Sequence, residues 1–166
     1  TAAFSLSHFE IRTERLAEME AFYSDCLGFE VTDRSSGGGM VFLSRNPDEH
    51  HQLVLSEADG GDGRRLDHIA FRAASLAEIR EISNSLAGNA AAGLESVSHG
   101  NSWSLYFRDP DGNRLEVFAD TPWHVRQPVR FAMDYALSET EIIRRTRDHI
   151  CDMPDFMAVE KWKKSR

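Results

Sequence analysis

The sequence contains little cysteine, no long apolar run and no excess of positive charge. Its 166 residues include two cysteines, Cys26 and Cys151. Two distant cysteines are too few for a disulfide framework, so we expect reduced thiols. No stretch of 18 apolar residues occurs, which argues against a transmembrane helix.

The charge balance excludes further partners. Lys and Arg number 19 against 27 Asp and Glu, and the formal net charge is −8. Nucleic-acid binders usually carry a basic patch, and anionic membranes attract basic segments, so we expect neither nucleic acid nor membrane as a partner. The first residues, TAAFSLSHFEIR, lack the basic and apolar regions of a secretory signal, which favours a cytoplasmic protein.

A pattern of one strand, one helix and three strands occurs twice in the chain. Alternating apolar residues indicate the strands, and apolar residues at helical spacing indicate the helices. The first set lies at 6–11, 14–28, 29–34, 40–45 and 51–57, and the second at 66–73, 75–88, 94–98, 102–108 and 113–120. The repeat predicts an α+β fold in which two βαβββ modules, about 5–57 and 66–119, are paired around a concave mixed sheet.

The residues after 120 break this pattern. They include Pro122 and Pro128 and a predicted helix from Ser138 to Cys151. We therefore expect one domain over residues 1–120 and a partly helical C-terminal extension over 121–166. The extension is expected to pack on the core or on a partner subunit.

The repeat aligns residues that could bind a metal. His8 and His68 occupy the same place in the two first strands, and Glu116 lies on the last strand of the second module. Strand parity directs all three away from the apolar side of their strands. In the first module Val54 stands where the second has Glu116, so the set is two imidazoles and one carboxylate. An octahedral metal held by this set keeps about three open positions, as in non-haem Fe(II) oxygenases, although Mn(II) accepts the same ligands.

Several segments resemble one superfamily. The segment SLYFRDPDGNRLEVFAD is similar to the closing motif of the vicinal oxygen chelate proteins, which include glyoxalases, bleomycin-resistance proteins and extradiol dioxygenases. LSHFEI and LDHIAFRA resemble the two first-strand histidine motifs of that group, and the resemblance spans about residues 5–120. Three features resemble the type I extradiol ring-cleaving dioxygenases. They are the segment PDEHHQLVL, Tyr106 ten residues before Glu116, and His99 upstream of Tyr106. The single pair of modules implies a single-domain form.

This resemblance implies an enzyme and its cofactor. It implies an Fe(II)-dependent dioxygenase that inserts both atoms of O2 into a catechol-type diol and cleaves the ring beside the hydroxyls. His8, His68 and Glu116 would be the iron ligands. Small members of the superfamily commonly dimerise, so a homo-oligomer is expected.

The resemblance also implies three groups around the metal. His51 would stabilise bound oxygen and act as an acid, Tyr106 would hydrogen-bond the substrate, and His99 would help to hold it. Histidine titrates near neutrality and suits proton transfer. Strict alternation, however, puts His50 rather than His51 on the face of Val54, and a bulge at the strand entry would reverse that.

Two other functions remain open from the sequence. One is an isomerase, lyase or epimerase of the glyoxalase type, against which Val54 argues because such sites usually supply four ligands. The other is a drug-binding protein without turnover, which needs no metal triad.

A few aromatic residues complete the expectations. Trp103 is expected in the core, and Phe131 either caps an aromatic substrate or packs on the domain. His124 and His149 are expected to be solvated.

Overall fold

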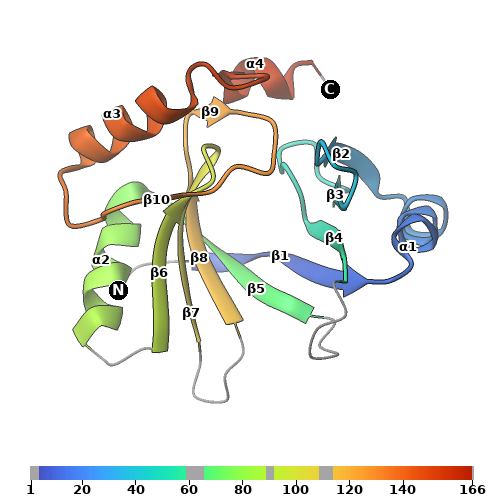
Figure 1. Ribbon diagram of the computed structural model, residues 1–166, viewed down its shortest axis with the longest axis horizontal. Coiled ribbons are helices and arrows are strands. Elements are labelled where there is room, and N and C mark those ends of the chain that lie inside the picture. Colours follow the sequence, from blue (N-terminus) through green and yellow to red (C-terminus); the bar gives the residue numbers. More distant parts are fainter. Residues whose placement is uncertain (1–3, 59–65, 89–91, 109–113, 166) are drawn as a thin grey trace. The chain divides into compact units, whose positions relative to one another are not determined.

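The structure is a computed structural model that describes residues 4–58, 66–88, 92–108 and 114–165. It contains the expected βαβββ order twice (Figure 1). The first run is β1 (Phe4–Thr13), α1 (Leu16–Ala21), β2 (Glu30–Arg34), β3 (Met40–Ser44) and β4 (Leu53–Glu57). The second run is β5 (Leu66–Ala73), α2 (Leu76–Gly88), β6 (Ala92–Ser98), β7 (Ser102–Arg108) and β8 (Arg114–Asp120). The predicted mixed α+β class is therefore confirmed.

The remaining elements lie in the C-terminal segment. They are β9 (Trp123–His124), β10 (Phe131–Ala132), α3 (Glu139–Ile150), β11 (Met157–Ala158) and α4 (Val159–Lys163). The expected helix between Ser138 and Cys151 is confirmed: the Ser138 side chain caps α3 by accepting from the Glu141 N–H.

The chain divides into two compact units. One is formed by Ser7–Ile69, and the other by Ala70–Arg166 together with the start of β1. The predicted division at residue 120 into a domain and an extension stays a prediction.

In the unit of residues 7–69 the strand order is β1-β4-β3-β2. β1 runs parallel to β4, whereas β3 is antiparallel to both of its neighbours. Its core is made by Leu43 and Leu55, against which Ile11 of β1 and Leu16 of α1 pack. Because successive strand residues face opposite ways, His8 of β1 points to the side of the sheet away from this core.

The first helix is shorter than expected. α1 ends at Ala21 and continues as one wide π-helical turn, η1 (Phe22–Cys26). After it the Phe29 N–H bonds back to the Tyr23 carbonyl at 3.0 Å, and Gly28 adopts a φ of +68° that closes this wide turn.

In the unit of residues 70–166 the strands follow the order β10-β6-β7-β8. α2 packs against β7 and β8 (Figure 1). The core joins Ile79 of α2, Leu105 of β7 and Val117 of β8 with Ile142 of α3. Helix α3 of the C-terminal segment therefore shares one core with the second module.

Two tryptophans make the contacts that hold the C-terminal segment in place. Trp103 is in the core as expected, and its Nε1–H donates to Thr146 Oγ1 at 2.9 Å. The expectation that His124 is solvated is wrong. Its ring is buried and stacks on Trp162 of α4 with the centroids 4.5 Å apart, because the pairing of β9 with β11 brings α4 over it.

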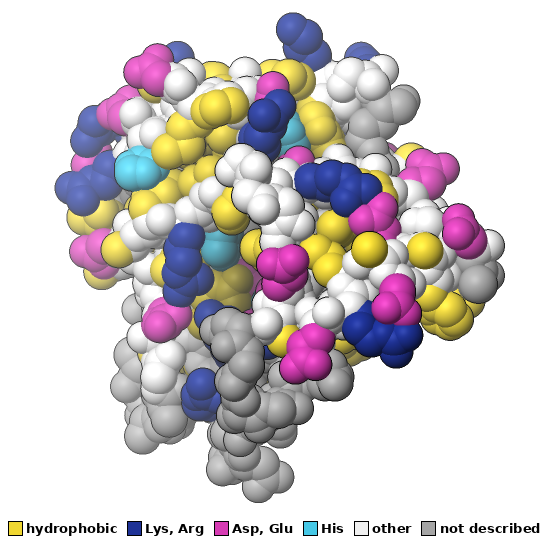
Figure 2. Space-filling model, turned by 45° about the vertical axis from the view of Figure 1, so that its right-hand side comes forward, with side chains coloured by type: hydrophobic (Ala, Val, Ile, Leu, Met, Phe, Trp, Pro, Cys, Tyr) yellow, Lys and Arg dark blue, Asp and Glu magenta, His cyan; other side chains and the backbone are white. Residues whose placement is uncertain are grey.

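The surface charges are mixed. Figure 2 shows basic and acidic side chains interspersed on the face that it draws. Among the residues that the structure describes, no helix has both the length and the apolar character needed to span a bilayer.

Candidate functional site

Two predicted ligands meet in the unit of residues 7–69. The Nε2 atoms of His8 and His68 lie 3.3 Å apart, and both side chains are 5% exposed. Lone pairs on two imidazole nitrogens repel at this distance unless a proton or a cation lies between them. The distance fits a hydrogen bond in which one Nε2 carries the proton, and it equally fits two neutral histidine ligands that point at one ion.

The histidine pair at 50 and 51 lies beside this group. The His51 ring is centred 4.2 Å from the ring of His8, whereas the Nε2 of His50 lies 3.4 Å from Asp33 Oδ2. The Nδ1 atoms of the two histidines are 2.8 Å apart. Both residues precede β4, which begins at Leu53, so strict strand alternation does not apply to them.

Carboxylates surround the outer nitrogen of His68. Asp67 Oδ2 lies 2.9 Å from His68 Nδ1, and Glu10 Oε2 lies 3.6 Å from it. Asp67 also forms an ion pair with Arg12 of β1, and Glu10 accepts a hydrogen bond from Ser56 at 2.9 Å. His68 Nδ1 thus faces acceptors, while Nε2 faces His8.

The unit of residues 70–166 brings three further predicted residues together. The His99 Nε2 atom lies 3.0 Å from the Tyr106 hydroxyl, and its Nδ1 lies 2.6 Å from the Val129 carbonyl oxygen. Because a carbonyl only accepts, Nδ1 donates to it, and in neutral His99 the Nε2 lone pair accepts the phenol proton. Tyr106 stands directly across from Glu116 in the pairing of β7 with β8.

The phenol of Tyr106 is held in its neutral form. Burial raises its pKa well above the ordinary value, and the charge of Glu116 and a hydrogen bond to Glu116 raise it further. Arg114 and Arg130 act in the opposite direction, with guanidinium carbons 4.3 and 5.2 Å from the ring centroid. The one phenol proton therefore has two acceptors, His99 and Glu116. Glu116 itself is 3% exposed.

The six predicted residues thus form two groups. His8, His51 and His68 are in contact in one unit, and His99, Tyr106 and Glu116 are in contact in the other.

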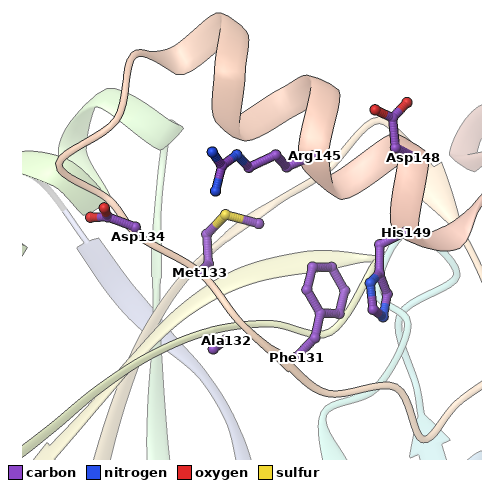
Figure 3. A pocket seen from close by; sticks show the side chains of 7 residues that line it. All are labelled: Phe131, Ala132, Met133, Asp134, Arg145, Asp148 and His149. Carbon is purple, nitrogen blue, oxygen red and sulfur yellow. The ribbon is translucent and has the colours of Figure 1, made fainter.

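A separate hollow of about 380 Å³ lies between α3 and the segment around β10 (Figure 3). Its lining includes Phe131, Met133, Arg145 and His149, and it contains none of the six residues. The Phe131 ring faces the imidazole of His149 with the centroids 3.9 Å apart. Phe131 therefore packs against α3, and His149 is exposed as expected.

Comparison with known proteins decides the family. Residues 5–117 match the Glyoxalase family, described as the glyoxalase/bleomycin resistance protein/dioxygenase superfamily. The chain belongs to this superfamily. Among curated members, biphenyl-2,3-diol 1,2-dioxygenase 3 of Rhodococcus globerulus is 31% identical over 121 residues, covering 69% of this chain and 63% of that protein. Metapyrocatechase of Geobacillus stearothermophilus is 29% identical over 128 residues, covering 74% and 37%.

A solved structure supports the same family assignment. Homoprotocatechuate 2,3-dioxygenase from Arthrobacter globiformis superposes with a TM-score of 0.57 at 28% identity, covering 69% of this chain and 37% of that one. The chain thus spans less than two thirds of the length of each of these three relatives. The predicted resemblance to the superfamily is confirmed, and the similar proteins are named as dioxygenases.

Several residues that contact the six predicted site residues were not predicted from the sequence. The ion pair of Arg12 with Asp67 and the hydrogen bond of Asp67 to His68 were not expected. The second carboxylate, Glu10, had a signal in the sequence, since it lies two residues after His8 on the same face of β1. Arg130 had none, because it reaches Tyr106 from an irregular segment.

Proposed function

We propose that this chain is an Fe(II)-dependent extradiol dioxygenase, which inserts both atoms of O2 into a catechol-type diol and cleaves the ring beside the hydroxyls. The observation that carries the proposal is the convergence of two buried Nε2 atoms, those of His8 and His68, at 3.3 Å. The names of the similar proteins supply the reaction class.

The proposed metal ligands are His8, His68 and Glu116. The two histidines come from equivalent strands of the two modules, and the repeat assigns the third ligand to Glu116. A buried carboxylate is costly unless a positive charge compensates it, and a divalent cation supplies one. Val54 occupies the place in the first module that Glu116 has in the second, and it stands opposite Glu10 in the pairing of β1 with β4. A valine side chain cannot bind a metal, so this position contributes no ligand. The site therefore has three protein ligands.

When bound by these three residues, Fe(II) would supply about three open positions for the diol and O2. The chain's residues support a divalent metal in general, and Fe(II) follows from the proposed reaction. Mn(II) accepts the same ligands.

The surrounding residues have proton-transfer roles in this proposal. His99 is oriented by the Val129 carbonyl and accepts a hydrogen bond from the Tyr106 hydroxyl. Tyr106 is kept neutral by burial and by Glu116, and it would donate to a substrate oxygen by turning its one proton away from His99. His51 lies against the proposed ligand His8 and would stabilise bound oxygen and act as an acid. His50 contacts His51 and Asp33, which makes His51 the better candidate for that role.

The experiment loads the protein with Fe(II) under argon, measures bound iron, and then adds catechol or 2,3-dihydroxybiphenyl with and without air. We expect one iron per chain and a yellow ring-opened product only in air. Product formation that proceeds equally under argon would contradict the proposal and favour a glyoxalase-type isomerase or lyase. Ligand binding that is unchanged after metal removal would favour a binding protein.

His8→Ala and Glu116→Ala are the informative variants. Each should lose bound iron, because two protein ligands hold a divalent ion far more weakly than three. Exposed His149→Ala is the matched control and should retain iron. Iron binding equal to the wild type in Glu116→Ala would remove Glu116 from the ligand set.

A further inference from the structure

We propose that Asp67 is a positioning residue for the metal site, holding the Nδ1 proton of His68 so that the Nε2 lone pair faces the metal. The inference rests on the proposed function, since it concerns how this chain prepares the metal ligand His68.

The contact itself is short and sheltered. Asp67 Oδ2 lies 2.9 Å from His68 Nδ1, and each side chain is 5% exposed. Arg12 pairs with the other carboxylate oxygen, Oδ1. An ionised carboxylate can only accept hydrogen bonds, so the proton between Asp67 and His68 belongs to Nδ1. In a neutral imidazole this leaves the lone pair on Nε2, the atom that faces His8.

Chain adjacency alone does not produce this contact. Neighbouring residues of a strand direct their side chains to opposite faces, so Asp67 and His68 would normally not bond to each other. Arg12 comes from β1, 55 positions before Asp67, and its guanidinium engages the carboxylate from that strand. The orientation of His68 thus depends on a long-range pair, Arg12 with Asp67.

A second carboxylate adds to the same environment. Glu10 Oε2 lies 3.6 Å from His68 Nδ1, too long for a hydrogen bond, and its Oε1 accepts from Ser56. Glu10, Asp67 and His68 are close enough to one another to hold an ion of their own. However, Asp67 is already paired with Arg12 and the Nδ1 of His68 is directed at Asp67. We therefore assign Glu10 and Asp67 to holding the Nδ1 side of His68, which leaves its Nε2 lone pair for the metal, and not to a second metal site.

The chemical consequence is a stronger and better oriented ligand. A carboxylate on the far nitrogen of a ligating histidine fixes its tautomer and ring plane and raises the basicity of the ligating nitrogen. Losing such a partner typically weakens metal affinity by about 10- to 100-fold.

Mn(II) is the probe for the test, because free Mn(II) is measured directly by its EPR signal and needs no turnover. We expect Asp67→Ala to raise the dissociation constant of the protein for Mn(II) by about 10- to 100-fold. Asp120→Ala is the matched control, since Asp120 also pairs with an arginine, Arg72, and has a side chain that is 59% exposed. The control should stay within about twofold of the wild type. An Asp67→Ala protein that also stays within about twofold would overturn the proposal.

The double variant Arg12→Gln/Asp67→Ala separates positioning from charge. If Asp67 only neutralises Arg12, removal of both should restore Mn(II) affinity. The proposal predicts that affinity stays at least about 10-fold weaker than in the wild type, and full recovery would contradict it.

A metal-free readout separates this inference from the proposed function. Two-bond proton–nitrogen NMR spectra of the histidine rings report which nitrogen carries the proton, and His68→Gln identifies the His68 signals. We expect an Nδ1 proton on wild-type His68 and its loss in Asp67→Ala. If the wild type binds no Mn(II), the proposed metal site fails, and the NMR spectra alone decide the role of Asp67: an unchanged tautomer in Asp67→Ala refutes it.

Discussion

Thr146 joins helix α3 to the second module through one buried hydrogen bond. The side chain is fully buried in α3, and its hydroxyl donates to the Ile142 carbonyl at 2.8 Å. It accepts at the same time from Trp103 Nε1–H of β7 at 2.9 Å, and Trp103 is 4% exposed. The indole N–H can only donate, so it depends on this hydroxyl.

Thr146→Val keeps the shape of the side chain and removes the acceptor. A buried donor left without its partner costs about 1–3 kcal/mol. The Ile142 carbonyl keeps its helical backbone partner, so we add nothing for that bond. We expect the free energy of unfolding to fall by about 2 kcal/mol. For a chain of this size that corresponds to a fall in Tm of about 4–8 °C.

Urea denaturation followed by tryptophan fluorescence measures the change. The control is Thr140→Val, which makes the same chemical change at an exposed position of α3 and should alter stability by less than about 0.5 kcal/mol. In a Trp103→Phe background, where no indole N–H exists, Thr146→Val should cost far less. An equal cost in both backgrounds would refute the reasoning, because the loss would then not come from the indole hydrogen bond.

Three other changes test separate parts of the structure. Gly100→Ala places a Cβ 2.6 Å from Val125 at a φ of +77°, and should lose about 1–3 kcal/mol more in urea than Gly38→Ala, which has a similar φ and open space; equal losses would exclude the clash. Tyr106→Phe should leave the tyrosinate absorbance rise near pH 10 unchanged, because burial raises the Tyr106 pKa well above it; a smaller rise in the variant would contradict this. The Glu141 pKa is about 2, lowered by hydrogen bonds from two arginines of α3. Its stabilising effect is therefore complete above its ordinary pKa of 4.5 and is lost as pH falls toward 2, so the Tm difference between wild type and Glu141→Gln should shrink over that range and would refute the pairing if constant.

The internal repeat made much of the fold predictable. Each module has the same order of strands and helix, and the equivalence of His8 and His68 follows from aligning the two first strands. Strand parity alone placed Trp103 with Leu105 on the buried side. These features depend on periodicity within short segments, which a sequence displays directly.

Contacts between distant segments could not be predicted in this way. The burial of His124 depends on Trp162, which lies 38 positions further along the chain, and no local pattern connects them. Asp67 engages His68 against the alternation of the strand because Arg12 holds it from β1. The choice between His50 and His51 was open because both precede the start of β4, where alternation gives no direction.

The most direct test of the central proposal is the stoichiometry of oxygen uptake. Wild-type protein loaded with Fe(II) under argon would meet catechol, 2,3-dihydroxybiphenyl and protocatechuate in aerated buffer, with an oxygen electrode and visible absorbance recorded together. The proposal predicts one O2 consumed for each molecule of yellow ring-opened product formed from at least one of these diols. Iron-loaded protein that forms product from a diol without consuming oxygen, or that consumes none with any of the three, would contradict it.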